Sequence, residues 1–102
     1  MRIITHDDGR CLTLRLLGEL DHAAAQEVMP GIEDAVEEYL PRRCVLDLSG
    51  LSFMDSSGIG VIIGRCKNLG YSGGDVSACH LNERVDKIFT VSGLKKIIQV
   101  KE

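Results

Sequence analysis

The stretch from residue 44 to residue 70, CVLDLSGLSFMDSSGIGVIIGRCKNLG, carries most of the information about the fold. Residues 44–48 are too continuously apolar for a half-exposed strand, which predicts a central strand of a parallel sheet. A loop over residues 49–55 is expected next. A helix with apolar residues at helical spacing then runs to Asn68 or Leu69, and Gly70 ends it. A buried strand followed at once by a helix is typical of an α/β domain.

The N-terminal half predicts a hairpin and a long helix. Residues 11–17 alternate between apolar and polar, and the apolar residues before the sequence HDDGR (6–10) indicate a short preceding strand and a turn. Asp21 is a good N-cap for a helix that starts at His22 or Ala23 and runs toward Leu40. Pro30 predicts a kink or a restart of that helix. The expected buried side chains are Leu12, Leu14 and Leu16 in the strand, and Val28, Ile32, Ala35 or Val36, and Tyr39 or Leu40 in the helix.

The C-terminal part repeats the alternation of strand and helix. A strand over 75–81 is followed by Asn82, which caps a helix with Val85, Ile88 and Phe89 facing inward, and Gly93 ends that helix. Residues 97–100 predict a last short strand. The expected fold is therefore one α/β domain over residues 1–102, with a mostly parallel central sheet, one antiparallel edge strand and flanking helices.

Composition excludes several classes of protein. A net charge of −3 over 102 residues, with a sequence pI near 5.6, argues against nucleic-acid binding. No apolar run is long enough for a membrane span, and the N-terminus lacks the features of a signal peptide, so a cytoplasmic location is expected. The four cysteines and three histidines are scattered without metal-ligand spacing, which predicts buried small thiols in a reducing compartment and neither metal nor cofactor.

The sequence DSSG at residues 55–58 permits several interpretations. The simplest is a helix cap from Asp55 or Ser56, with Gly60 and Gly64 on one face to let the helix lie close to the sheet. A dinucleotide site is disfavoured because the glycine spacing departs from G-x-G-x-x-G. A serine nucleophile is disfavoured because G-x-S-x-G is absent and only His22 could serve as base.

A further interpretation is that one of the two serines is modified. A phosphate at a helix N-terminus meets unpaired N–H groups and the positive end of the dipole. Asp21 and Asp55 would add negative charge at the same edge of the sheet, where a docked partner would be repelled. Ile59 and Val61 are expected to form an apolar patch there. The spacing does not choose between Ser56 and Ser57.

Three segments resemble the anti-sigma factor antagonists, the small bacterial STAS domains, and most of all the sporulation type that acts on the anti-sigma F factor. These segments are GELDHAAAQE (18–27), LSFMDSSGIGVIIGRCK (51–67) and SGLKKII (92–98). The resemblance implies phosphorylation on Ser56 as an off switch. It also implies a partner-binding surface made of Asp21, Asp55, Ser57, Gly58, Ile59, Gly60 and Val61.

The partners that the resemblance implies are an anti-sigma factor, which is a GHKL-type serine kinase that uses ATP, and a PP2C-type phosphatase. The unphosphorylated antagonist binds the kinase and frees the sigma factor, and this chain is itself no enzyme. Two alternatives remain: a STAS module of a general stress or sensory system, and a small nucleotide-binding protein. The sequence departs from the family at Pro30-Gly31, and where it ends at Glu102 family members often carry a further helix.

Overall fold

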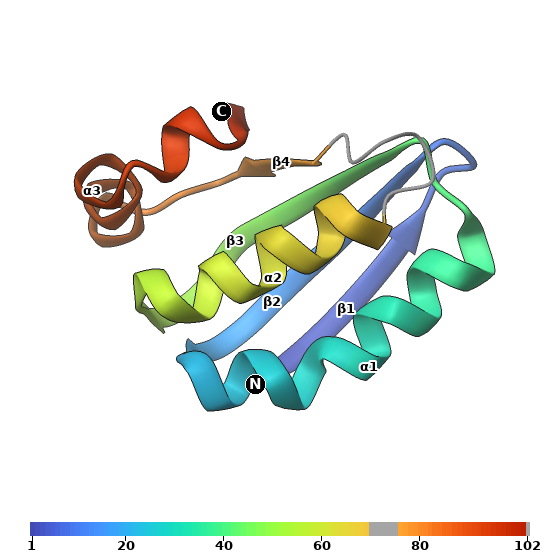
Figure 1. Cartoon of the computed structure of the whole chain (residues 1–102), viewed down its shortest axis with the longest axis horizontal. Helices are drawn as coiled ribbons and strands as arrows, with labels where there is room; N and C mark the ends of the chain where they lie inside the picture. Colours follow the sequence, from blue (N-terminus) through green and yellow to red (C-terminus); the bar gives the residue numbers. More distant parts are fainter. Residues whose placement is uncertain (70–75, 102) are drawn as a thin grey trace.

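The computed structural model describes residues 1–69 and 76–101. In these residues a five-stranded sheet has the order β1-β2-β3-β4-β5, and α1 and α2 lie side by side against one face of it (Figure 1). Only β1 and β2 pair antiparallel; the other three pairs are parallel, as predicted. The strands are β1 (Arg2–Asp7), β2 (Cys11–Leu20), β3 (Arg43–Met54), β4 (Val76–Cys79) and β5 (Gln99–Lys101), and the helices are α1 (His22–Tyr39), α2 (Ser56–Leu69), α3 (Glu83–Ser92) and the short 3₁₀ helix η1 (Leu94–Lys96).

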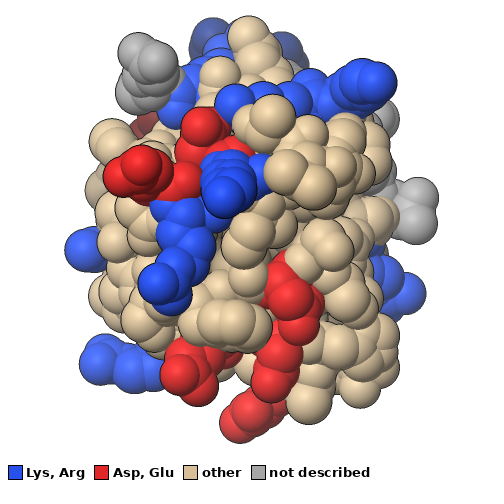
Figure 2. Space-filling view, turned by 90° about the vertical axis from the view of Figure 1, so that its left-hand side faces the viewer, with Lys and Arg blue, Asp and Glu red and all other residues tan. Residues whose placement is uncertain are grey.

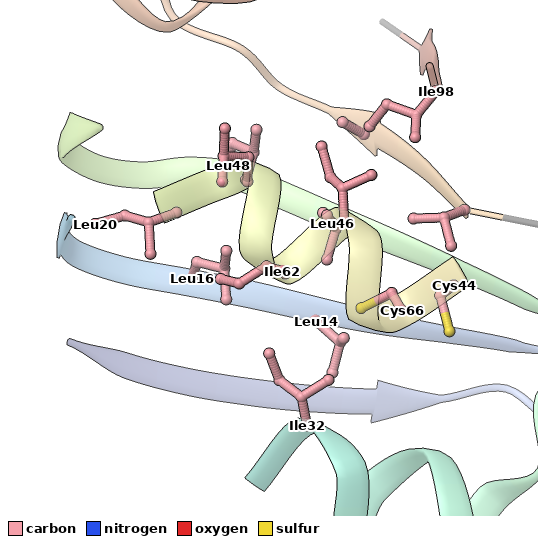
Figure 3. Close-up of a cluster of buried hydrophobic side chains, with 14 of the residues drawn as sticks. Leu14, Leu16, Leu20, Ile32, Cys44, Leu46, Leu48, Ile62, Cys66 and Ile98 are labelled. Atoms are coloured by element: carbon pink, nitrogen blue, oxygen red, sulfur yellow. The ribbon is translucent and has the colours of Figure 1, made fainter. Parts of the chain in front are cut away.

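The core lies between the sheet and the helices (Figure 3). Leu12, Leu14 and Leu16 of β2 are fully buried while Arg15 between them is exposed, which confirms the predicted alternation. From α2 the core receives the side chains of Ile59, Ile62, Ile63 and Cys66. Burial raises the pKa of the Cys66 thiol to about 12. Cys66 therefore acts as a small apolar residue at neutral pH, as the sequence predicted.

Strand β3 is longer than the sequence indicated, and the expected loop over residues 49–55 is wrong. The strand continues to Met54 because β2 is ten residues long and keeps pairing with it, from Leu17 opposite Gly50 to Leu20 opposite Met54. Leu51 and Met54 are buried, so this extension also adds to the core. The connection to α2 shrinks to Asp55, which holds the start of α2 at the end of β3.

Helix α1 begins as predicted, with the Asp21 side chain accepting a hydrogen bond from the Ala24 N–H at 2.8 Å. It runs through Pro30 without restarting, and a kink there stays a prediction. The sequence predicted that Tyr39 or Leu40 would be the last buried residue of this helix, and this prediction is wrong because both side chains are exposed. Leu40 adopts a left-handed conformation that ends the helix, so its side chain does not continue the buried face. Ala25 and Met29 are buried in addition to the predicted Ile32, Ala35 and Val36, while Val28 is half-buried.

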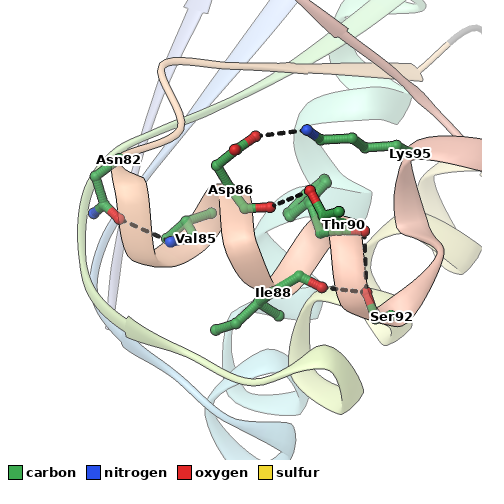
Figure 4. Close-up of polar contacts among 8 residues, drawn as sticks. Asn82, Val85, Asp86, Ile88, Thr90, Ser92 and Lys95 are labelled. Atoms are coloured by element: carbon green, nitrogen blue, oxygen red, sulfur yellow. Dashed lines mark hydrogen bonds and ion pairs between the residues drawn. The ribbon is translucent and has the colours of Figure 1, made fainter.

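Helix α3 has the predicted caps at both ends, and Figure 4 shows the N-terminal one. The Asn82 side chain accepts from the Val85 N–H at 2.9 Å, and Gly93 takes the left-handed conformation at φ 79°. Val85 and Phe89 are buried, and Ile88 is half-buried. An ion pair between Lys95 and Asp86 at 2.7 Å fastens η1 to α3.

The last strand, β5, occupies residues 99–101 instead of 97–100, because η1 takes up the chain immediately before it. The predicted positions Gly70 and Asp75 lie outside the described residues. Among the helices that the structure describes, none is long and apolar enough to cross a membrane.

Candidate functional site

The starts of α1 and α2 are tied together at the carboxyl ends of β2 and β3. The Asp55 N–H donates to the Leu20 carbonyl oxygen at 3.1 Å, which joins the two strand ends directly. The Asp55 side chain accepts from the Gly58 N–H at 2.6 Å and caps α2, just as Asp21 caps α1. Of the two predicted caps for α2, Asp55 is therefore the one used, and Ser56 is the first helical residue.

Gly58 allows the start of α2 to lie close to the backbone of Leu20 and Asp21. A Cβ atom at this position would lie 2.7 Å from the Asp21 carbonyl oxygen and 3.0 Å from that of Leu20. Both atoms belong to the backbone, so α2 can rest on this junction only where residue 58 lacks a side chain. The sequence assigned this close-packing role to Gly60 and Gly64, and that prediction is wrong, since a Cβ at either position meets nothing within 4 Å.

Ser57 is held by a chain of side chains from α1. The His22 Nδ1 lies 3.2 Å from the Ser57 hydroxyl, and the His22 Nε2 lies 3.2 Å from the Gln26 side-chain nitrogen. This chain of contacts joins the start of α1 to the start of α2, so the Ser57 hydroxyl already has a side-chain partner.

Ser56, in contrast, is exposed and its hydroxyl has no hydrogen-bond partner among the residues that the structure describes. It borders a shallow hollow of about 340 Å³ that α3 completes with Lys87, Ile88, Val91 and Ser92. Val91 is 80% exposed, so it presents an apolar side chain to solvent at the rim of this hollow. Sequence reasoning missed these α3 residues; the only signal was an apolar residue outside the buried stripe of α3.

Figure 2 looks onto this end of the molecule. Acidic and basic side chains are both present, and in the upper part of the view they lie next to one another. The negative charge expected from Asp21 and Asp55 is therefore accompanied by basic groups, with Lys87 beside Ser56.

The structure brings most of the predicted partner-binding residues to this junction. Asp21 and Ser57 are exposed, Asp55 is half-buried, and Gly58 is buried beneath the junction. Gly60 and Val61 are half-buried and follow within the next turn of α2. The expectation that Ile59 belongs to an uncovered apolar patch is wrong, because its side chain is fully buried in the core. The exposed apolar surface next to Ser56 comes from Val91 of α3 instead.

The same geometry disfavours a nucleotide phosphate at the start of α2. The Gly58 N–H, which a phosphate would need, is already bound by the Asp55 carboxylate at 2.6 Å. A second anion beside that carboxylate would be repelled.

The STAS domain family model matches residues 2–102. The chain belongs to the STAS domain family. An anti-sigma F factor antagonist of Paenibacillus polymyxa is 40% identical over 89 residues, which cover 87% of this chain and 76% of the relative. An anti-sigma-B factor antagonist of Bacillus subtilis (strain 168) is 30% identical over 89 residues, which cover 87% of this chain and 80% of the relative.

The fold is also similar to that of solved STAS structures. The anti-sigma factor antagonist SpoIIAA in its unphosphorylated form has a TM-score of 0.76 at 28% identity, covering 99% of this chain and 89% of that chain. SpoIIAA of Bacillus in the phosphorylated form has a TM-score of 0.67 at 27% identity, covering 99% of this chain and 92% of that chain. The resemblance that the sequence motifs indicated is therefore confirmed.

Proposed function

We propose that this STAS domain is an anti-sigma factor antagonist, a binding protein and not an enzyme, that phosphorylation of Ser56 switches off. The observation that carries the proposal is the contrast between two neighbouring hydroxyls. Ser57 is engaged by His22 at 3.2 Å, while Ser56 is exposed and has no partner in the described residues. A kinase can therefore reach the Ser56 hydroxyl without first breaking a contact.

The start of α2 is suited to hold the phosphate that the kinase adds. Ser56 is the first residue of the helix, where N–H groups lack intrahelical partners and the dipole is positive. The helix dipole stabilises an anion at such a position by about 0.3–1 kcal/mol, and together with the positive charge of Lys87 across the hollow it offsets the repulsion from the Asp55 carboxylate. The phosphorylated domain therefore keeps its fold.

The effect of the phosphate falls on the partner. A charge of about −1.5 to −2 arrives between the Asp21 and Asp55 carboxylates on one side and the exposed Val91 on the other. A partner that covers Val91 must bury this charge, which costs desolvation energy in addition to repulsion from its own acidic groups. The unphosphorylated domain binds the anti-sigma factor and the phosphorylated one does not.

The kinase is the anti-sigma factor itself, a GHKL-type serine kinase that uses ATP with Mg²⁺, and a PP2C-type phosphatase resets the domain in the cytoplasm. The anti-sigma F relative at 40% identity favours the sporulation system over the general stress system, whose antagonist is 30% identical. Binding assays with the anti-sigma F and anti-sigma B factors in parallel separate the two systems.

The experiment is to incubate the chain with the anti-sigma factor and Mg-ATP and to locate the phosphate by fragmentation mass spectrometry. We expect one phosphate, on Ser56, that is absent in Ser56→Ala and retained in the matched control Ser57→Ala. Ser56→Ala should still bind the anti-sigma factor, and Ser56→Asp should lose about 2–5 kcal/mol of binding free energy. Phosphate on Ser57 or Thr90 in the wild-type chain would overturn the site assignment.

A further inference from the structure

Three side chains with metal-binding chemistry meet on the sheet face that points away from the helices. Asp47 lies between Leu46 and Leu48, which are buried under the helices, so its side chain points to the opposite face. Cys79 at the end of β4 is the in-register partner of Asp47 and shares that face. One ligand atom each from Asp47, Cys79 and His80 lie within 4.8 Å of one another.

His80 reaches this group through an unusual backbone conformation. It follows Cys79 directly, so in a continued strand its side chain would point to the other face of the sheet. Its φ is instead 57°, in the left-handed region, which is strained for a residue that has a Cβ atom. Strained residues of this kind cluster at functional sites. Here the strained turn brings the imidazole to the thiol and the carboxylate.

The backbone orients the Asp47 carboxylate. One Asp47 oxygen accepts from the Ser49 N–H at 3.0 Å, which leaves the other oxygen for a ligand bond.

We propose that Asp47, Cys79 and His80 bind a Zn²⁺ ion, with water as the fourth ligand. Sulfur, imidazole nitrogen and carboxylate oxygen are the three ligand types that proteins offer to zinc. Around a tetrahedral ion with bonds of about 2.0–2.3 Å, the ligand atoms lie roughly 3.3–3.7 Å apart. Shifts of the ligand atoms by about 1 Å, through side-chain rotation, would therefore bring all three into contact with the ion. The thiol ligand favours zinc over magnesium and calcium, because those two ions prefer oxygen ligands.

Two basic residues lie beside the site on the neighbouring strands. Arg15 of β2 is the in-register partner of Asp47, and Lys101 of β5 is that of Cys79. The bound ion would fasten β4 to β3 directly before Asn82, the residue that caps α3.

The test is titration of the metal-free, reduced chain with Zn²⁺ by calorimetry, with Co²⁺ as a spectroscopic probe of thiolate ligation. We expect one ion per chain, a thiolate-to-cobalt absorption band, and a Tm that rises with zinc concentration. Cys79→Ser and His80→Ala should each lower the affinity by at least about tenfold, and Cys79→Ser should abolish the band. The matched control His6→Ala should bind as the wild-type chain does.

His80→Gly separates the metal role from a structural one. Glycine accepts the left-handed conformation without strain, so this variant should raise the Tm of the metal-free chain while it removes zinc binding. The proposal is overturned by a titration without saturable binding, by unchanged affinity in Cys79→Ser, or by an equal loss in His6→Ala. A lower metal-free Tm in His80→Gly would refute the strain argument.

Discussion

Replacing Gly58 with alanine tests how closely α2 rests on the junction between β2 and α1. The added methyl would lie 2.7 Å from the Asp21 carbonyl oxygen, 2.8 Å from its carbonyl carbon and 3.0 Å from the Leu20 carbonyl oxygen. All three atoms belong to the backbone and cannot rotate away, so the start of α2 must move. Such overpacking costs about 1–3 kcal/mol.

A matched control removes the effect of helix propensity. Alanine is favoured over glycine in a helix by about 0.8–1.0 kcal/mol, and this gain partly offsets the clash in Gly58→Ala. Gly64→Ala has the same gain without a clash, because its Cβ meets nothing within 4 Å. The control should therefore be stabilised, and the difference between the two variants should equal the contact cost of about 1–3 kcal/mol.

The assay is urea denaturation followed by circular dichroism, with Tm as a second measure. For a domain of this size each kcal/mol corresponds to roughly 4–8 °C, so the two variants should be well separated. The displaced helix start should also slow phosphorylation of Ser56 in Gly58→Ala but not in Gly64→Ala. Equal stability of the two variants would refute the close packing of α2 against the backbone of Leu20 and Asp21.

Three further predictions concern the cap, the exposed surface and the buried thiol. Asp55→Ala removes the hydrogen bond to the Gly58 N–H and should cost about 1 kcal/mol in urea denaturation, as Asp21→Ala should at the start of α1. Val91→Asp should change the free energy of unfolding by less than about 0.5 kcal/mol, because Val91 is 80% exposed, yet weaken anti-sigma factor binding in calorimetry; unchanged binding would remove Val91 from the interface. The raised pKa of Cys66 means that the folded chain holds this proton more tightly than the unfolded chain, whose thiol titrates near 9.0. Its contribution to stability is therefore complete below pH 9.0 and is lost as pH rises toward about 12, and Cys66→Ala should show a shallower alkaline decline in the urea midpoint.

Local patterns predicted those parts of the fold that local physics determines. The alternation of Leu12, Leu14 and Leu16 identifies the buried face of β2, since a strand turns every second side chain to the same side. Asp21 and Asn82 identify two helix starts because their short side chains reach the first-turn N–H groups.

Features that depend on strand register or on distant segments were missed. Residues 49–52, with the sequence SGLS, have the composition of a turn. They nevertheless continue β3, because β2 is ten residues long and its last residues pair with them. The sequence does not distinguish Gly58 from Gly64 as a site of close packing. A Cβ atom would contact backbone atoms only at Gly58, because the junction between β2 and α1 passes beside that residue. The meeting of Asp47 with Cys79 likewise requires the register between β3 and β4.

The Asp55 N–H bond to the Leu20 carbonyl ties the start of α2 to the end of β2, directly before the start of α1. Under the proposed function, a docking protein would therefore encounter the same backbone contour with or without a phosphate on Ser56, and only the charge on that contour would differ. No segment would have to refold between the two states, so the kinase and the phosphatase alone would set the lifetime of each state.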